Sequence, residues 1–167
     1  LLDEPFGALD ANVRADLRAW LRRLHEEVPV TTVIVTHDQE EAMEISDRIA
    51  VMSHGRIEQV GAPRELYEQP GNDFVMRFLG PVTEIGEQLV RPHDLHLLAD
   101  AHPGAREAMV GRVVHLGFEV RAELILADGA AIVAQVTRAE AEQLELRTGD
   151  IVWVATDRQP AGEPVRV

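Results

Sequence analysis

Residues 1–10 read LLDEPFGALD: two leucines run directly into the adjacent acids Asp3 and Glu4, and a Pro/Gly turn then leads to a third acid, Asp10. A strand normally has about five or six residues, so Leu1-Leu2 is expected to be the end of a strand whose beginning is missing. Acids at the carboxyl end of a buried strand lie where open α/β sheets bind ligands and metals. These ten residues therefore predict one side of a ligand site.

The residues that follow predict a βαβ unit. Between Ala11 and Val28, apolar residues recur at spacings of three and four, which is the pattern of a helix with one apolar stripe. Asp10 can cap the N-terminus of this helix. Trp20 is expected to be buried in the hydrophobic core of the protein. Residues 30–35, VTTVIV, predict a buried parallel strand. A right-handed crossover places the ends of both strands on one edge, so His37 is expected near the Asp3-Glu4 pair.

The chain is predicted to form two domains, 1–80 and 81–167, that meet at Gly80-Pro81. The first continues with an Asp38–Glu41 capping box and further short helices, and its two glutamates 40 and 41 are expected on a solvated helix face. In the second, residues 119–127 alternate apolar and polar, and further strands are predicted at 110–115, 131–136 and 150–155. The predicted fold class is thus α/β followed by all-β, with the second domain a small barrel of the oligonucleotide/oligosaccharide-binding (OB) type.

The composition excludes several kinds of protein. The formal net charge of −13 argues against a broad surface for nucleic acid or anionic lipid, and the lack of cysteine excludes disulfides and thiolate metal sites. No apolar run approaches the roughly 18 residues that a membrane span needs. All 16 basic residues are arginine, so the Walker A loop, G-x-x-x-x-G-K-[ST], cannot lie in this chain.

Three motifs together resemble the ATPase subunits of ABC importers. Residues 1–5 are similar to the Walker B motif, residues 6–10 to the D-loop, and residues 35–42, VTHDQEEA, to the region of the switch histidine. Residues 90–94, VRPHD, open what looks like a regulatory barrel, and they most resemble sulfate/thiosulfate import subunits. The resemblance implies the C-terminal part of a P-loop NTPase domain (RecA-like, ABC-type) at 1–80 and an OB-like regulatory domain of the TOBE type at 81–167.

The same resemblance implies roles for four residues. Asp3 would hold Mg²⁺, Glu4 would polarise the attacking water, His37 would sense the γ-phosphate of ATP, and Asp10 would reach a second ATPase subunit of a homodimer. The intact parent would use ATP and Mg²⁺ and would bind transmembrane permease subunits at the cytoplasmic face of the membrane, without direct membrane insertion or nucleic acid. Because the Walker A and signature motifs are absent, the chain is expected to be a fragment that by itself neither binds ATP tightly nor hydrolyses it.

Two other functions remain open from the sequence. The barrel could be a stand-alone oxyanion-sensing or dimerisation module, with Arg91, Arg112 and Arg121 as its contacts. Alternatively, Asp3, Glu4 and His37 could serve by themselves in a metal-dependent phosphohydrolase. A zinc site at His93 and His96 is not expected, because residues three apart on a strand point to opposite faces.

Overall fold

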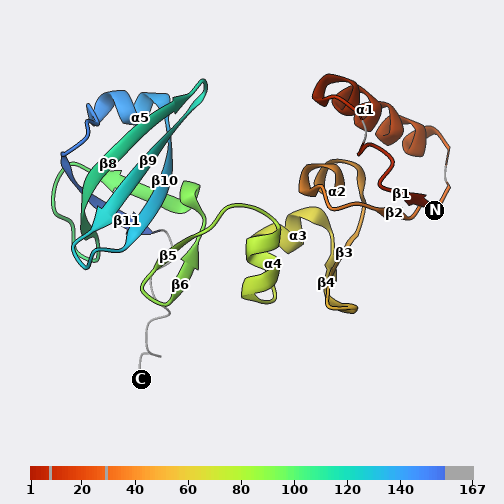
Figure 1. The fold of residues 1–167 in the computed structure, drawn as a ribbon, viewed down its shortest axis with the longest axis horizontal. Helices are drawn as coiled ribbons and strands as arrows, with labels where there is room; N and C mark the ends of the chain where they lie inside the picture. The colour runs from red at the N-terminus through yellow and green to blue at the C-terminus, as the bar shows by residue number, and fades with distance from the viewer. Residues whose placement is uncertain (8, 29, 157–167) are drawn as a thin grey trace, which may run out of the picture. The chain divides into compact units, whose positions relative to one another are not determined.

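The computed structural model describes residues 1–7, 9–28 and 30–156 of the chain. The chain divides into two compact units between Gly80 and Pro81 (Figure 1). Residues 157–167 of the second predicted domain lie outside the described residues. Within the described ranges, no helix is long and apolar enough to cross a membrane.

The first unit alternates short strands with helices. Its elements are β1 (Leu2–Asp3), α1 (Ala11–Glu27), β2 (Ile34–Val35), α2 (Gln39–Ile45), β3 (Ile49–Ser53), β4 (Arg56–Gly61), α3 (Pro63–Glu68) and α4 (Asp73–Phe78). β1 and β2 pair in parallel, with Leu2 opposite Ile34 and Asp3 opposite Val35, and β3 and β4 form an antiparallel hairpin. The βαβ order therefore follows the sequence prediction.

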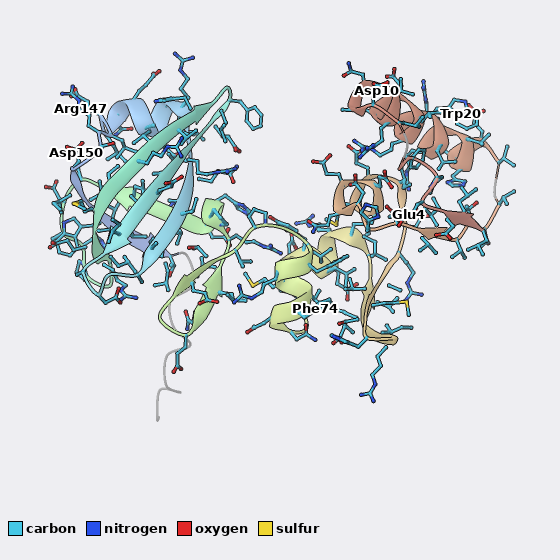
Figure 2. All side chains as sticks on the ribbon, in the orientation of Figure 1. Glu4, Asp10, Trp20, Phe74, Arg147 and Asp150 are labelled. Carbon is cyan, nitrogen blue, oxygen red and sulfur yellow. The ribbon has the colours of Figure 1, made fainter. Side chains whose placement is uncertain are left out.

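The expectations for the strand at 30–35 and for Trp20 were wrong. The predicted buried strand at 30–35 is reduced to Ile34–Val35, and its valines are half or more exposed. The reason is that β1 offers only two residues to pair with. The carbonyl of Val33 still accepts from the N–H of Leu2, but residues 30–32 have no partner in the described β1–β2 pair. Trp20, expected in the core, is 53% exposed (Figure 2). The buried face of α1 includes Arg18, and Trp20 lies about 200° around the helix from it.

The core of the βαβ unit is built around the loop that follows β1. Phe6 in this loop is buried against Leu21 of α1 and Ile45 of α2. This contact fixes the path of the chain between β1 and α1. Asp10 then begins α1 as its N-cap, as predicted, since its side chain accepts from two backbone N–H groups of the first turn.

The second unit is an antiparallel β domain. Its elements are β5 (Thr83–Ile85), β6 (Gln88–Val90), the 3₁₀ helix η1 (Pro92–Asp94), β7 (Leu95–Leu98), β8 (Arg106–Leu116), β9 (Glu119–Leu126), β10 (Ala131–Thr137), α5 (Arg138–Gln143) and β11 (Ile151–Thr156). Five strands form one sheet in the order β10-β9-β8-β11-β7, and β5 and β6 form a separate hairpin. The sequence predicted strands in the regions of β8, β9, β10 and β11, and only that of β9 was predicted from alternation. It predicted none of the shorter strands β5, β6 and β7.

The register of β8 and β9 separates the core face from the solvent face. The inward residues of β9 are all nearly inaccessible: Val120, Ala122, Leu124 and Leu126. Near Gly111, β8 contains an extra residue, so that Val110 pairs with Leu124 and Arg112 pairs with Glu123. This β-bulge keeps the apolar residues of β8 on the core face on both sides of the irregularity.

Neighbouring residues of β9 provide a test of this register. Leu124 is 1% exposed and Ile125 is 40% exposed. Leu124→Ala is expected to lower the free energy of unfolding by about 3 kcal/mol, because it removes packed side-chain atoms from the core. Ile125→Ala, on the opposite face, is expected to cost less than about 1 kcal/mol. Urea denaturation measures both, and equal losses would contradict the register.

Candidate functional site

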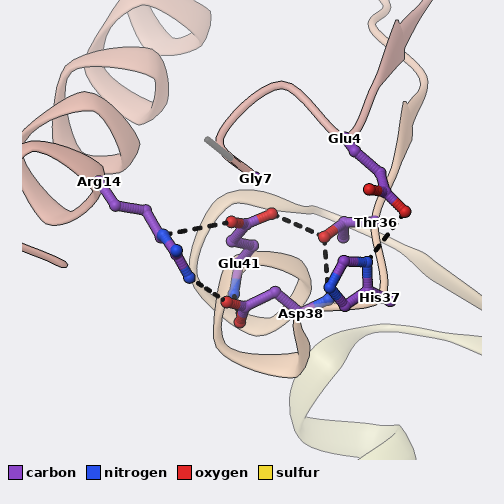
Figure 3. A pocket seen from close by; sticks show the side chains of 7 residues that line it. All are labelled: Glu4, Gly7, Arg14, Thr36, His37, Asp38 and Glu41. Carbon is purple, nitrogen blue, oxygen red and sulfur yellow. Dashed lines mark hydrogen bonds and ion pairs between the residues drawn. The ribbon is translucent and has the colours of Figure 1, made fainter. Parts of the chain in front are cut away.

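The candidate site lies where β1 and β2 end. Glu4 directly follows β1, and one residue, Thr36, separates His37 from the end of β2. The parallel pairing brings these ends together, and Nδ1 of His37 lies 2.9 Å from Oε1 of Glu4 (Figure 3). The proximity of His37 to Glu4 therefore follows from the topology that the sequence predicts.

The backbone of Glu4 is strained. Its φ angle is 44°, in the left-handed region that disfavours side chains with a Cβ by about 1–2 kcal/mol. Glu4 nonetheless keeps one ladder bond, because its N–H donates to the carbonyl of Val35 at 2.8 Å. Its own carbonyl accepts from the N–H of Gly7 at 3.2 Å, which closes the turn. Strained residues of this kind cluster at functional sites, where the surrounding structure holds them.

Glu4 changes the acid–base behaviour of His37. The hydrogen bond to the Glu4 carboxylate, followed by the negative charge of that carboxylate, raises the pKa of His37 above its ordinary value despite a small opposing effect of burial. The side chains of His37 and Glu4 are 77% and 53% exposed. An exposed pair of this kind contributes little to stability, so it must be positioned by other contacts.

A chain of hydrogen bonds behind His37 holds the loop in which it lies. The Thr36 hydroxyl donates to the Glu41 carboxylate at 2.6 Å and accepts from the N–H of Asp38 at 2.9 Å. Asp38 caps α2 by accepting from the N–H of Glu41 at 3.1 Å, which is one half of the predicted capping box. The reciprocal bond is not made, because the N–H of Asp38 donates to Thr36 and not to the Glu41 side chain. Glu41 is only 2% exposed, so its expected place on a solvated helix face was wrong. It turns inward because Thr36 and Arg14 surround its carboxylate.

Asp38 is held in its charged form. Burial by itself would raise the pKa of Asp38, but the backbone N–H of Glu41 and the guanidinium of Arg14 hold that pKa below its ordinary value. Arg14 donates to Asp38 at 2.9 Å. Arg14 was not predicted as a site residue; the one available signal in the sequence was its place in the first turn of α1, four residues after Asp10.

These residues enclose a small pocket. Its volume is about 50 Å³, and it is lined by Glu4, Gly7, Arg14, Thr36, His37, Asp38 and Glu41. Pockets that bury a drug-sized ligand usually have about 300–1,000 Å³, whereas one water occupies about 30 Å³. An open depression of about 430 Å³ adjoins it at residues 37–40. The enclosed part can hold water beside Glu4 and His37, but not a nucleotide.

The other two predicted site residues lie apart from this pocket. Asp3 is exposed in β1, and Asp10 uses its carboxylate to accept from the N–H groups of Asn12 and Val13, both at 3.1 Å. Neither is among the described residues that line the pocket. Across the described part of the chain, no three His, Asp or Glu side chains gather as a metal-binding group.

The arginines considered for an oxyanion site in the second unit have other partners. Arg112 lies 3.6 Å from Glu123, and Arg121 lies 3.7 Å from Glu119. Arg91 is buried, and its guanidinium donates to the carbonyl of Pro81 at 3.3 Å. The structure does not bring these three side chains together as a set aimed at one ligand.

Comparisons with known proteins identify relatives of both units. Residues 107–159 match the TOBE domain family. The chain is 59% identical to the sulfate/thiosulfate import ATP-binding protein CysA of Nocardia farcinica, over 96% of this chain and 52% of that protein. It is 57% identical to the protein of the same name in Mycobacterium tuberculosis, over 96% of this chain and 49% of that protein. It is 50% identical to the protein of the same name in Synechococcus elongatus, over 92% of this chain and 49% of that protein. The chain thus spans about half the length of the curated relatives it matches.

Among solved structures, a match covers 41% of this chain and 52% of the cytoplasmic molybdate-binding protein ModG with molybdate bound. Its TM-score is 0.38 and its sequence identity is 18%.

The influence of Glu4 on His37 can be measured directly. Glu4→Gln removes the carboxylate charge, so the pKa of His37 is expected to fall toward the ordinary histidine value of about 6.5. NMR titration of the His37 ring in the parent chain and in Glu4→Gln measures this change in pKa. Glu26→Gln on α1 removes the same charge away from the site and serves as the control. An unchanged His37 titration in Glu4→Gln would contradict the pairing.

Because the pKa of His37 is raised in the folded protein, the direction in which the pairing changes stability with pH is fixed. The pairing contributes stability below the unfolded pKa of histidine and loses it as the pH rises through the folded pKa.

Proposed function

Because nearly the whole chain is homologous to the C-terminal part of sulfate/thiosulfate import ATP-binding proteins, we propose that it supplies that part of the ATP-hydrolysing motor subunit of an ABC importer. The transported solute is then sulfate, thiosulfate or another small oxyanion. The observation that carries the proposal is the meeting of Glu4 and His37, from two strand ends, at 2.9 Å beside a water-sized pocket.

Glu4 and His37 have complementary roles in this proposal. Phosphoryl transfer needs a positioned nucleophile and donors for the charge that develops on the phosphate. Glu4 accepts a hydrogen bond from the attacking water and orients it. The raised pKa of His37 favours the protonated ring, which donates to the γ-phosphate. Their mutual hydrogen bond keeps both side chains at the same edge of the β1–β2 pair.

Asp3 is the residue proposed to hold Mg²⁺. It presents an exposed carboxylate at the end of β1, and Mg²⁺ is commonly held by one or two carboxylates, with phosphate oxygens and water completing its ligands. This single carboxylate fits the ion only as one ligand, and phosphate oxygens and water would supply the others. Adjacent side chains diverge at the end of a strand, which favours Asp3 on the metal and Glu4 on water. When bound, the ion neutralises charge on the phosphates.

The described site is one part of the catalytic arrangement. The chain has no lysine and hence no Walker A loop, and its enclosed pocket is too small for a nucleotide. The proposal therefore assigns ATP binding to the parent protein and predicts that the 167-residue chain alone is inactive. In the parent, Asp10 faces a second motor subunit, and the assembly binds transmembrane permease subunits at the cytoplasmic face of the membrane.

A chimera tests the proposed function. This chain replaces the aligned half of the Nocardia farcinica relative, and hydrolysis of Mg-ATP is measured. The chimera is expected to hydrolyse ATP, and Glu4→Gln is expected to reduce the rate by about 100-fold or more, because it removes the group that orients the water. Glu26→Gln is the matched control and should leave the rate unchanged.

Two results would contradict this proposal. One is a folded, ATP-binding chimera in which Glu4→Gln hydrolyses ATP as fast as the parent chimera. The other is hydrolysis by the unjoined chain, which would favour the phosphohydrolase alternative and its use of Asp3, Glu4 and His37 alone.

An oxyanion sensor in the second unit would bind sulfate or molybdate, whereas the proposed function requires no such binding. Since Arg112 and Arg121 each face a glutamate, the chain is expected to show no saturable binding of sulfate or molybdate. Isothermal titration calorimetry with each anion measures this. Saturable binding that Arg112→Gln or Arg121→Gln abolishes would favour the sensor.

A further inference from the structure

α1 carries three arginines at four-residue spacing, and each faces acids that follow β2. Arg14 pairs with Asp38, Arg18 pairs with Glu44, and Arg22 pairs with Asp47. Residues four apart lie on one face of a helix, so the three form a stripe along α1. Arg18 and Arg22 reach acids within α2 and just beyond its end, which ties the two helices together.

Arg14 differs from the other two in what it joins. One terminal nitrogen donates to Asp38, which directly follows His37, at 2.9 Å. The other donates to the carbonyl of Leu9, in the loop that begins at Glu4, at 3.2 Å. One guanidinium thus connects the loop that carries Glu4 with the loop that carries His37. Figure 3 shows its ion pairs with Asp38 and Glu41.

The surroundings of Arg14 make this connection firm. The side chains of Arg14 and Asp38 are 29% and 23% exposed, and Glu41, 4.0 Å from Nε of Arg14, is almost fully buried. Partly buried charges are screened less by water and salt than exposed ones. By contrast, the Glu4–His37 pair is mostly exposed and cannot fix its own geometry.

We propose that Arg14 is a positioning residue for the Glu4–His37 pair. Its planar fork of donors holds the Leu9 carbonyl and the Asp38 carboxylate at a fixed separation, which sets the distance between the two loops. The importance of this positioning for ATP hydrolysis rests on the proposed function. The geometric effect on His37 does not, and it can be measured without nucleotide.

The test compares two arginines of the same stripe in the 167-residue chain. The measured quantities are the chemical shifts of the two imidazole ¹⁵N nuclei of His37, recorded at the same neutral pH for every variant. The Glu4→Ala variant gives the reference shifts of a ring that has lost its carboxylate partner. Arg14→Gln is expected to move these shifts at least half of the way to the reference. Arg22→Gln removes the same charge and another α1 ion pair, and is expected to leave them in place.

A second variant tests the route through Asp38. Asp38→Asn removes the charge that Arg14 binds but keeps a side chain able to cap α2. It is expected to reproduce the shift change of Arg14→Gln, and the double variant is expected to go no further than either single variant, since all three break one interaction.

The proposal is overturned if folded Arg14→Gln keeps the parent shifts, or if Arg22→Gln moves them equally. Should Arg14→Gln fail to fold by circular dichroism, Asp38→Asn decides: parent shifts in that variant overturn the proposal, and shifts toward the reference support it. None of these readings depends on whether the chimera hydrolyses ATP, so the two proposals can fail separately.

Discussion

The two-residue parallel pairing of β1 with β2 determines where Glu4 and His37 meet. Hydrogen bonds from the N–H groups of Leu2 and Glu4 to the carbonyls of Val33 and Val35 fix this register. Because parallel strands end on the same edge, residues far apart in sequence meet there. Two-stranded pairs are weak by themselves, so the register depends on what packs around it. In the described part of the chain, the buried Phe6 and the side chains of α1 and α2 that contact it provide this packing.

Two charged side chains are buried in the first unit beside its apolar clusters. Arg18 and Glu41 are buried among the apolar side chains that join α1 to α2. Buried charges are costly unless they are paired, and each of these has a partner of opposite charge. Such pairs are directional, which apolar contacts are not. They therefore specify how α1 and α2 are aligned, and the position of the loop ahead of α2 follows from that alignment.

Local signals in the sequence predicted much of this structure. The caps at Asp10 and Asp38 and the long strands of the second unit follow from short-range patterns, and the approach of His37 to Glu4 follows from topology. The exposure of Trp20 and the burial of Glu41 do not, because each depends on which side of a helix meets another element. Arg14 was missed for the same reason: its partner Asp38 lies 24 residues along the chain, and only the tertiary structure brings the two together.

The left-handed backbone of Glu4 has a consequence for how this protein can be stabilised. Glycine adopts such a conformation without steric cost, so substitution at residue 4 by glycine relieves strain that most other residues retain. A search for thermostable variants by folding alone would therefore favour glycine at this position and discard the carboxylate beside His37. Under the proposed function of Glu4, stability and chemistry are therefore in conflict at this residue.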